Sequence, residues 1–161
     1  MRATHPFMVL PGASRTQGPK GLGGEISFKV SERDTDGVWT LFETSSLPYA
    51  GPPLHFHRRQ DEWFYVLKEK HRFRIGSDEY TVQAGGSIFA PRMIPHTWEN
   101  TGVEPGKLLI LLQPAGRFEE FLIEFPALAR ESAAGVAVDR LFEKYDMELV
   151  GPPLSSPVQG V

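Results

Sequence analysis

The feature that most constrains the fold is a succession of short runs rich in β-branched and aromatic residues. Glycine and proline are abundant, 16 and 14 residues in a chain of 161, and they separate these runs with turns. Such spacing predicts an all-β protein, either a sandwich or a barrel, with strands of ordinary length. The expected strands are 25–30, 38–44, 62–67, 71–76, 79–82, 87–90, 96–100 and 107–113.

The periodicity changes after Pro114. Four apolar residues recur there at the spacing i, i+3, i+4 and i+7, which predicts an amphipathic helix that Pro126 ends or kinks: Phe118, Phe121, Leu122 and Phe125. Residues 136–147 predict a second helix. These two helices either cover an open face of the barrel or form a dimer contact. The expected organisation is a flexible lead-in (1–24), a β-barrel (25–114), a helical segment packed on it (115–150) and a turn-like tail (151–161).

Composition excludes several classes of function. The chain has no cysteine, which excludes disulfides, thiolate metal sites and cysteine nucleophiles. A net charge of −3 gives no electrostatic footprint for nucleic acid. No apolar run approaches the roughly 20 residues that span a bilayer, and the N-terminus does not resemble a signal peptide. We therefore expect one soluble cytoplasmic domain with no nucleic-acid or membrane partner.

Three histidines and one glutamate form the candidate functional site. His55 and His57 stand two residues apart, so on a strand both imidazoles point to one face. Glu62 and the distant His96 complete a mixed nitrogen and oxygen ligand set. His57 and Glu62 are separated by an odd number of residues, which would place them on opposite faces of an unbroken strand. We therefore expect a turn or bulge at 58–61 that resets the alternation.

The same alternation predicts the surroundings of the metal. Glu62, Phe64 and Val66 should share one inward face, and His96, Trp98 and Asn100 another. The predicted substrate pocket comprises Phe64, Trp98, Met93 and Phe89. Each of these side chains could instead have a purely structural role. The aromatic residues could belong to the ordinary core, Phe89 could face outward, and Met93 could pack within its loop. His71 is either a buried histidine at the end of the barrel or a substrate contact.

These residues resemble the two motifs of the cupin family. The first, G-x5-H-x-H-x(3,4)-E-x6-G, is similar at all its ligand positions, His55, His57 and Glu62. The second, G-x5-P-x-G-x2-H-x3-N, is similar at Gly85, Pro91, His96 and Asn100. Three glycine positions differ and are occupied by Tyr49, Glu69 and Met93. Gly51 stands two residues after the first of these positions. Glu69 and Met93 should adopt other turn geometries or carry strain, because glycine serves turns with positive φ.

The resemblance covers about residues 38–113 and is strongest to single-domain cupins of the quercetin dioxygenase-like group. It implies a small antiparallel jelly-roll barrel and one divalent transition metal per chain, either Fe, Mn, Ni, Cu or Zn, held by His55, His57, Glu62 and His96. It further implies an enol or flavonol substrate, dioxygen as co-substrate, and Glu62 as both ligand and catalytic base. Many cupins pair through sheet edges, so a homodimer is expected, with 25–30 as an edge or exchanged strand.

Other functions remain open at this point. The fold serves many chemistries, so a cupin isomerase, decarboxylase or lyase for a sugar or keto acid is one alternative. A non-catalytic module that binds a small ligand or a metal is a second alternative. The third is a degenerate barrel that binds no metal. A pocket rich in Lys, Arg and Gln would favour the sugar enzyme, whereas inward aromatics favour the dioxygenase-like enzyme.

Overall fold

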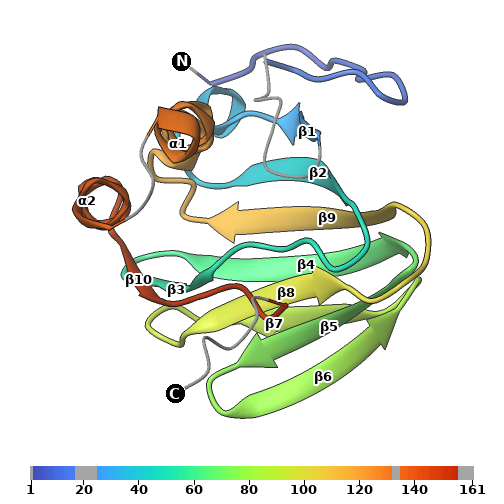
Figure 1. Cartoon of the computed structure of the whole chain (residues 1–161). Coiled ribbons are helices and arrows are strands. Elements are labelled where there is room, and N and C mark those ends of the chain that lie inside the picture. Colours follow the sequence, from blue (N-terminus) through green and yellow to red (C-terminus); the bar gives the residue numbers. More distant parts are fainter. Residues whose placement is uncertain (1, 17–24, 132–134, 156–161) are drawn as a thin grey trace, which may run out of the picture.

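Two five-stranded antiparallel sheets face each other in the computed structural model, which describes residues 2–16, 25–131 and 135–155 (Figure 1). The first sheet has the order β1 (Ile26–Val30), β2 (Thr40–Ser46), β9 (Gly106–Gln113), β4 (Asp61–Lys68) and β7 (Ser87–Ala90). The second has the order β10 (Met147–Gly151), β3 (Leu54–His57), β8 (His96–Asn100), β5 (Lys70–Ile75) and β6 (Asp78–Gln83). The predicted jelly-roll barrel is confirmed.

Alternating side chains build the core between the sheets. In β2 and β9 every second residue is buried, so one face of each strand points inward. The inward face of β9 is apolar, whereas that of β2 carries Phe42 among hydroxyl side chains. Phe64 and Val66 of β4 and Phe73 of β5 are almost completely buried in the same cluster. Burial of such side chains stabilises the fold by roughly 1.5–3 kcal/mol each.

The break expected at 58–61 carries the chain from one sheet to the other. β3 ends at His57 in the second sheet, and β4 begins at Asp61 in the first. Because the two strands face each other across the barrel, the odd spacing between His57 and Glu62 lets both side chains point inward. Glu62, Phe64 and Val66 are buried on one face of β4, as predicted.

Two helices follow the barrel and lie at one end of the sandwich (Figure 1). α1 (Phe118–Glu131) continues through Pro126, so the proline does not end it. α2 spans Val136–Lys144 and is shorter than the predicted helix 136–147. Asp146 has a φ of 58°, and the chain then enters β10, which pairs with β3. This tenth strand was not predicted. A short 3-10 helix, η1 (Glu32–Thr35), connects β1 and β2.

The three positions that depart from the cupin glycine pattern all have left-handed backbone. The φ angles are 62° at Tyr49, 65° at Glu69 and 66° at Met93. The turns therefore keep a geometry that suits glycine, although each residue carries a side chain. A residue with a Cβ in this region costs about 1–2 kcal/mol, so the strain expected at Glu69 and Met93 is present, and Tyr49 shares the same backbone geometry.

The chain before β1 contacts the outer edge of that strand. The backbone N–H of Arg15 donates to Phe28 O at 2.7 Å, and Phe28 N–H donates to Ser14 Oγ at 2.8 Å. Residues 17–24 of the predicted lead-in and 156–161 of the predicted tail lie outside the described residues. Among the helices that the structure describes, none has the length and hydropathy needed to cross a membrane.

Candidate metal centre

The four predicted ligands converge between the sheets. His55 and His57 come from β3, His96 from the neighbouring β8, and Glu62 from β4 of the opposite sheet. His55 and His96 are direct partners in the β3–β8 ladder. All four side chains are buried, and one potential ligand atom from each lies within 4.8 Å of the others.

Carbonyl oxygens fix the orientation of all three imidazoles. Nδ1 of His55 contacts Pro53 O at 2.8 Å, Nδ1 of His57 contacts Gln60 Oε1 at 2.9 Å, and Nδ1 of His96 contacts Ile94 O at 3.0 Å. Because a carbonyl oxygen only accepts, each Nδ1 carries the proton and donates. Each Nε2 therefore presents its lone pair, which is the tautomer of a metal ligand with an oriented second nitrogen.

Burial and charge set the protonation of the cluster. Burial, with smaller contributions from His96 and His57, lowers the pKa of His55 to about 3, so its imidazole is neutral at pH 7. Burial raises the pKa of Glu62, but the adjacent imidazoles of His57 and His96 lower it by more. The net pKa of this carboxyl lies well below its usual range, so Glu62 is ionised.

The donor set fits one divalent metal ion. Oε2 of Glu62 lies 2.9 Å from His96 Nε2 and 3.4 Å from His57 Nε2. Nε2 of His57 is buried and has no hydrogen-bond partner among the described residues. A buried polar atom without a partner is costly, and a cation among the four side chains would satisfy both the imidazole lone pairs and the carboxylate. Three imidazole nitrogens and one carboxylate oxygen suit the later first-row metals, and they do not select one of them.

Gln60 is a site residue that the sequence did not reveal. Its amide Nε2 donates to Pro114 O at 3.1 Å and to Ala115 O at 2.5 Å, so its Oε1 must face His57. The sequence placed Gln60 in a polar turn. The only local signal was the turn itself, since the two carbonyls that orient the amide follow β9, far along the chain.

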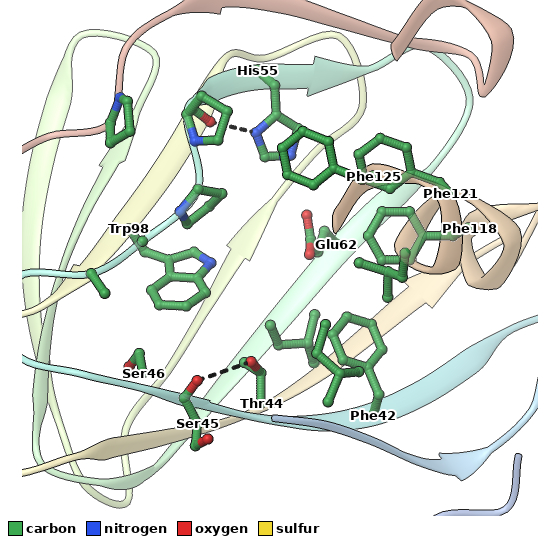
Figure 2. Close-up of a pocket in the computed structure, with 18 of the residues that line it drawn as sticks. Phe42, Thr44, Ser45, Ser46, His55, Glu62, Trp98, Phe118, Phe121 and Phe125 are labelled. Atoms are coloured by element: carbon green, nitrogen blue, oxygen red, sulfur yellow. Dashed lines mark hydrogen bonds between the residues drawn. The ribbon is translucent and has the colours of Figure 1, made fainter. Parts of the chain in front are cut away.

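A cavity of about 310 Å³ opens beside the ligands. His55 and Glu62 line it, and Trp98 lies across it from the aromatic side chains of α1, as Figure 2 shows. Most of the remaining wall is apolar and comes from both sheets and both helices. Its helical part consists of Phe118, Phe121, Leu122, Phe125 and Phe142. No lysine or arginine is among the described residues that line the cavity.

The structure brings only one of the four predicted pocket residues to this cavity. Trp98 lines it, whereas Phe64 is core and packs against Phe73 and the His96 ring. Phe89 pairs with Trp63 on the outward face of β7 and is 54% exposed. Met93 projects from the loop before β8 and is 55% exposed. Strand alternation turns Phe89 outward, and the left-handed turn directs Met93 to solvent.

Comparisons with known proteins agree with this architecture. Residues 45–112 match the family model of the cupin domain. An uncharacterized protein of Methanocaldococcus jannaschii is 30% identical over 67 residues, which cover 42% of this chain. The chain spans about half of that relative, 54% of its length.

Solved structures share the fold at low sequence identity. KdgF from Halomonas sp. has a TM-score of 0.57 at 16% identity, over 69% of this chain and 94% of that one. An RmlC-like cupin from Shewanella frigidimarina also has a TM-score of 0.57, at 18% identity, and the match covers 71% of this chain and 96% of that one. A predicted oxalate decarboxylase from Thermotoga maritima has a TM-score of 0.54 at 21% identity, and the match covers 56% of this chain and 80% of that one. At these identities the likeness shows the fold alone.

Proposed function

We propose that this chain, whose residues 45–112 match the family model of the cupin domain, is a metal-dependent, dioxygenase-like cupin enzyme. Its substrate would be a small, uncharged enol or aromatic molecule. The observation that carries the proposal is the cavity, which reaches the ligands His55 and Glu62 and is otherwise mostly apolar and aromatic. Cavities of about 300 Å³ are at the small end of ligand sites.

Glu62 would accept the proton of the substrate hydroxyl. It is the one carboxylate among the described residues that line the cavity, and it is ionised at neutral pH. A divalent metal held by the four ligands would lower the pKa of a substrate hydroxyl in contact with it and bring the substrate and dioxygen together. A lowered hydroxyl pKa matters here because a carboxylate of low pKa is a weak base.

The aromatic wall would orient a flat ring and keep water away from it. Trp98 and the phenylalanines of α1 lie on different sides of the cavity (Figure 2). Ring stacking and edge contacts with such side chains stabilise a bound aromatic ring by roughly 0.5–1.5 kcal/mol per pair beyond burial. The same burial would exclude water from the reacting centre.

The alternative enzymes need a different pocket. Keto acids are anionic and sugars carry many hydroxyls, and binding of either relies on cationic or numerous polar side chains. The described lining has no lysine or arginine. Neighbours named as a predicted oxalate decarboxylase and as KdgF support the fold only. We therefore favour the uncharged substrate.

The test begins with metal content. The full chain is purified without added metal, its metals are quantified by mass spectrometry, and it is then loaded separately with Fe, Mn, Ni, Cu and Zn. We expect about one metal per chain in the original protein and loss of that metal in His96→Ala. His5→Ala is the matched control, because His5 is exposed near the N-terminus, away from the four ligands.

Activity is measured next as oxygen uptake with a panel of flavonols and enols, and as CO2 release from oxalate. Oxygen uptake that requires both metal and Glu62, and is lost in Glu62→Gln, supports the proposal. Stoichiometric metal without oxygen uptake would favour a non-catalytic binding module. CO2 release from oxalate would favour a decarboxylase, and protein that binds no metal would contradict every metal-dependent role.

The proposal includes a homodimer. Outward side chains of β4 and β7 leave apolar surface exposed, including Leu67 and Phe89, and such surface often marks an interaction site. Sedimentation of the full chain at micromolar concentration should give the mass of two chains. A single species with the mass of one chain would exclude this part of the proposal without affecting the metal site.

A further inference from the structure

A second polar cluster lies at the far end of the cavity. Ser46, the last residue of β2, is buried and lines the cavity, and its Oγ lies 3.3 Å from Nε2 of His71 on β5 of the opposite sheet. Thr40 at the start of β2 is in register with Glu62 through Leu112 of β9. His71 is in register with Asn100 of β8, and His96 is in register with Ile75 of β5. The cluster of Ser46 and His71 is therefore displaced from the level of His96 by four residues of strand, about 13 Å.

His71 is fixed behind Ser46 by close packing. Its ring is fully buried and meets Trp98 edge-on, with the centroids 5.8 Å apart. Gly106 leaves room for it, because a Cβ at that position would lie 2.7 Å from Cε1 of His71. Burial lowers the pKa of His71 to about 4, so the imidazole is neutral at pH 7 and carries one N–H.

The position of that proton follows from the hydrogen bonds. Nδ1 of His71 is buried without a partner, whereas Nε2 faces Ser46 Oγ. A proton on Nδ1 would leave a buried donor unpaired, so the proton belongs on Nε2, and His71 donates to the hydroxyl. The hydroxyl proton of Ser46 then has no acceptor among the described residues, although Ser46 lines the cavity.

We infer that the Ser46 hydroxyl, oriented by His71, donates a hydrogen bond to the far end of an elongated, uncharged ligand whose other end reaches the metal centre. The acceptor on the ligand is a neutral oxygen of an ether, carbonyl or phenol. An anion would find no cationic partner among the described lining residues. The inference rests on the proposed function, because one end of the ligand is taken to reach the metal centre. It adds the Ser46 hydroxyl as the group that selects the other end of the ligand.

Matched ligands test this role without turnover. The full chain is loaded with Zn²⁺, which has no redox chemistry, and binding is followed by quenching of tryptophan fluorescence, since Trp98 lines the cavity. The probes are 3-hydroxyflavones with a methoxy or an ethyl group at the 3′ or the 4′ position. Each pair differs only by oxygen in place of a methylene group. We expect wild type to bind one methoxy compound about 3- to 10-fold more tightly than its ethyl partner.

The discriminating variant is Ser46→Ala, which should reduce this ratio to about 1. Thr44→Val is the matched control on the same face of β2, because the Thr44 hydroxyl already donates to Ser45 O, and it should keep the ratio of wild type. Equal binding of both members of both pairs by wild type, or no binding of any, would overturn the inference. So would a Ser46→Ala variant that keeps the ratio.

The tautomer gives an independent readout. Nitrogen NMR of the ligand-free protein should show His71 protonated at Nε2 at pH 7. Protonation at Nδ1 would mean that Ser46 donates to the imidazole, and the inference would fail. A protein that discriminates between the probes yet consumes no oxygen with any metal would refute the dioxygenase-like activity and leave this binding role intact.

Discussion

At the scale of single residues, Gln60 shows how an uncharged side chain controls a metal ligand. Its amide group is held by two backbone carbonyls, so only its oxygen can face His57. In Gln60→Leu, His57 loses the acceptor that fixes its tautomer and ring orientation. We expect the metal affinity to fall by about 10- to 100-fold, measured by competition with a chromophoric chelator.

The control for Gln60 is Gln83→Leu. Gln83 is exposed at the end of the edge strand β6, outside the metal cluster, and its variant should keep the affinity of wild type. A Gln60→Leu protein that is folded by circular dichroism and binds metal as tightly as wild type would show that His57 needs no orienting partner.

Met93 allows the backbone strain to be measured separately from the side chain. It has a φ of 66° and an exposed side chain. Met93→Gly relieves the left-handed strain, whereas Met93→Ala makes nearly the same truncation but keeps a Cβ. We expect Met93→Gly to be more stable than Met93→Ala by about 1 kcal/mol in urea unfolding. Equal stability of the two variants would mean that this turn relaxes.

The grouping of the four candidate ligands was predictable and their orienting partners were not. His55, His57, Glu62 and His96 stand in short motifs whose spacing determines which face each side chain occupies. Gln60 gains its role from carbonyls after β9, and local sequence cannot report a contact with a distant loop.

At the scale of elements, one buried carboxylate attaches α1 to the barrel. Glu119 accepts hydrogen bonds from Ser31 Oγ at 2.9 Å, from Glu32 N–H at 2.5 Å and from Thr40 Oγ1 at 3.0 Å. Glu119→Ala would leave the Ser31 hydroxyl and the Glu32 N–H without this acceptor in a buried site, whereas Thr40 keeps Val30 O as an acceptor. We expect it to lower the free energy of unfolding by about 2–4 kcal/mol, measured by chemical denaturation.

The neighbouring Glu120 provides the matched control for Glu119. It pairs with Arg117 on the exposed side of the same helix turn, so Glu120→Ala should change stability by less than about 0.5–1 kcal/mol. Since α1 also supplies much of the cavity wall, Glu119→Ala should weaken flavonol binding as well. Equal, small losses in both variants would show that Glu119 does not attach the helix.

The same junction predicts a dependence on pH. Burial and the charge of Glu119 raise the pKa of Glu32 to about 7. Between the ordinary value near 4.5 and this value the folded state binds a proton that the unfolded chain has lost, so stability declines as pH rises through this window. Glu32→Gln should flatten the decline in thermal unfolding between pH 5 and 8. An unchanged slope would contradict the assignment.

Element boundaries show where sequence reasoning stops. The apolar period of residues 136–147 continues past the end of α2, and it gave no sign that the chain leaves the helix near Tyr145. Residues 147–151 form the strand β10 because they pair with β3, which lies far away in sequence. Similarly, Phe118, Phe121 and Phe125 were recognised as one helix face, but only tertiary packing makes them a wall of the cavity.

At the scale of the whole molecule, metal binding should contribute to stability. A ligand that binds only the folded state stabilises it by about 2.7 kcal/mol at a concentration 100 times Kd. For a chain of this size that corresponds to a rise in Tm of roughly 5–10 °C. We expect chelation to lower the Tm of wild type by this amount, measured by calorimetry.

The ligand variants decide whether this effect comes from the proposed centre. His96→Ala should show little response of Tm to metal or chelator, whereas His5→Ala should respond as wild type does. A metal-dependent Tm that persists in His96→Ala would place the stabilising ion elsewhere on the molecule.

The pairing of β10 with β3 also bears on how the protein is made. All four candidate ligands are part of the nascent chain once His96 has been synthesised, but Met147–Gly151, which pairs with the strand of His55 and His57, is added much later. Until then the nascent chain presents an unpaired edge at its metal-binding strand. We expect the ion to be captured after synthesis of this segment, so metal supply would influence the yield of finished protein more than its rate of translation.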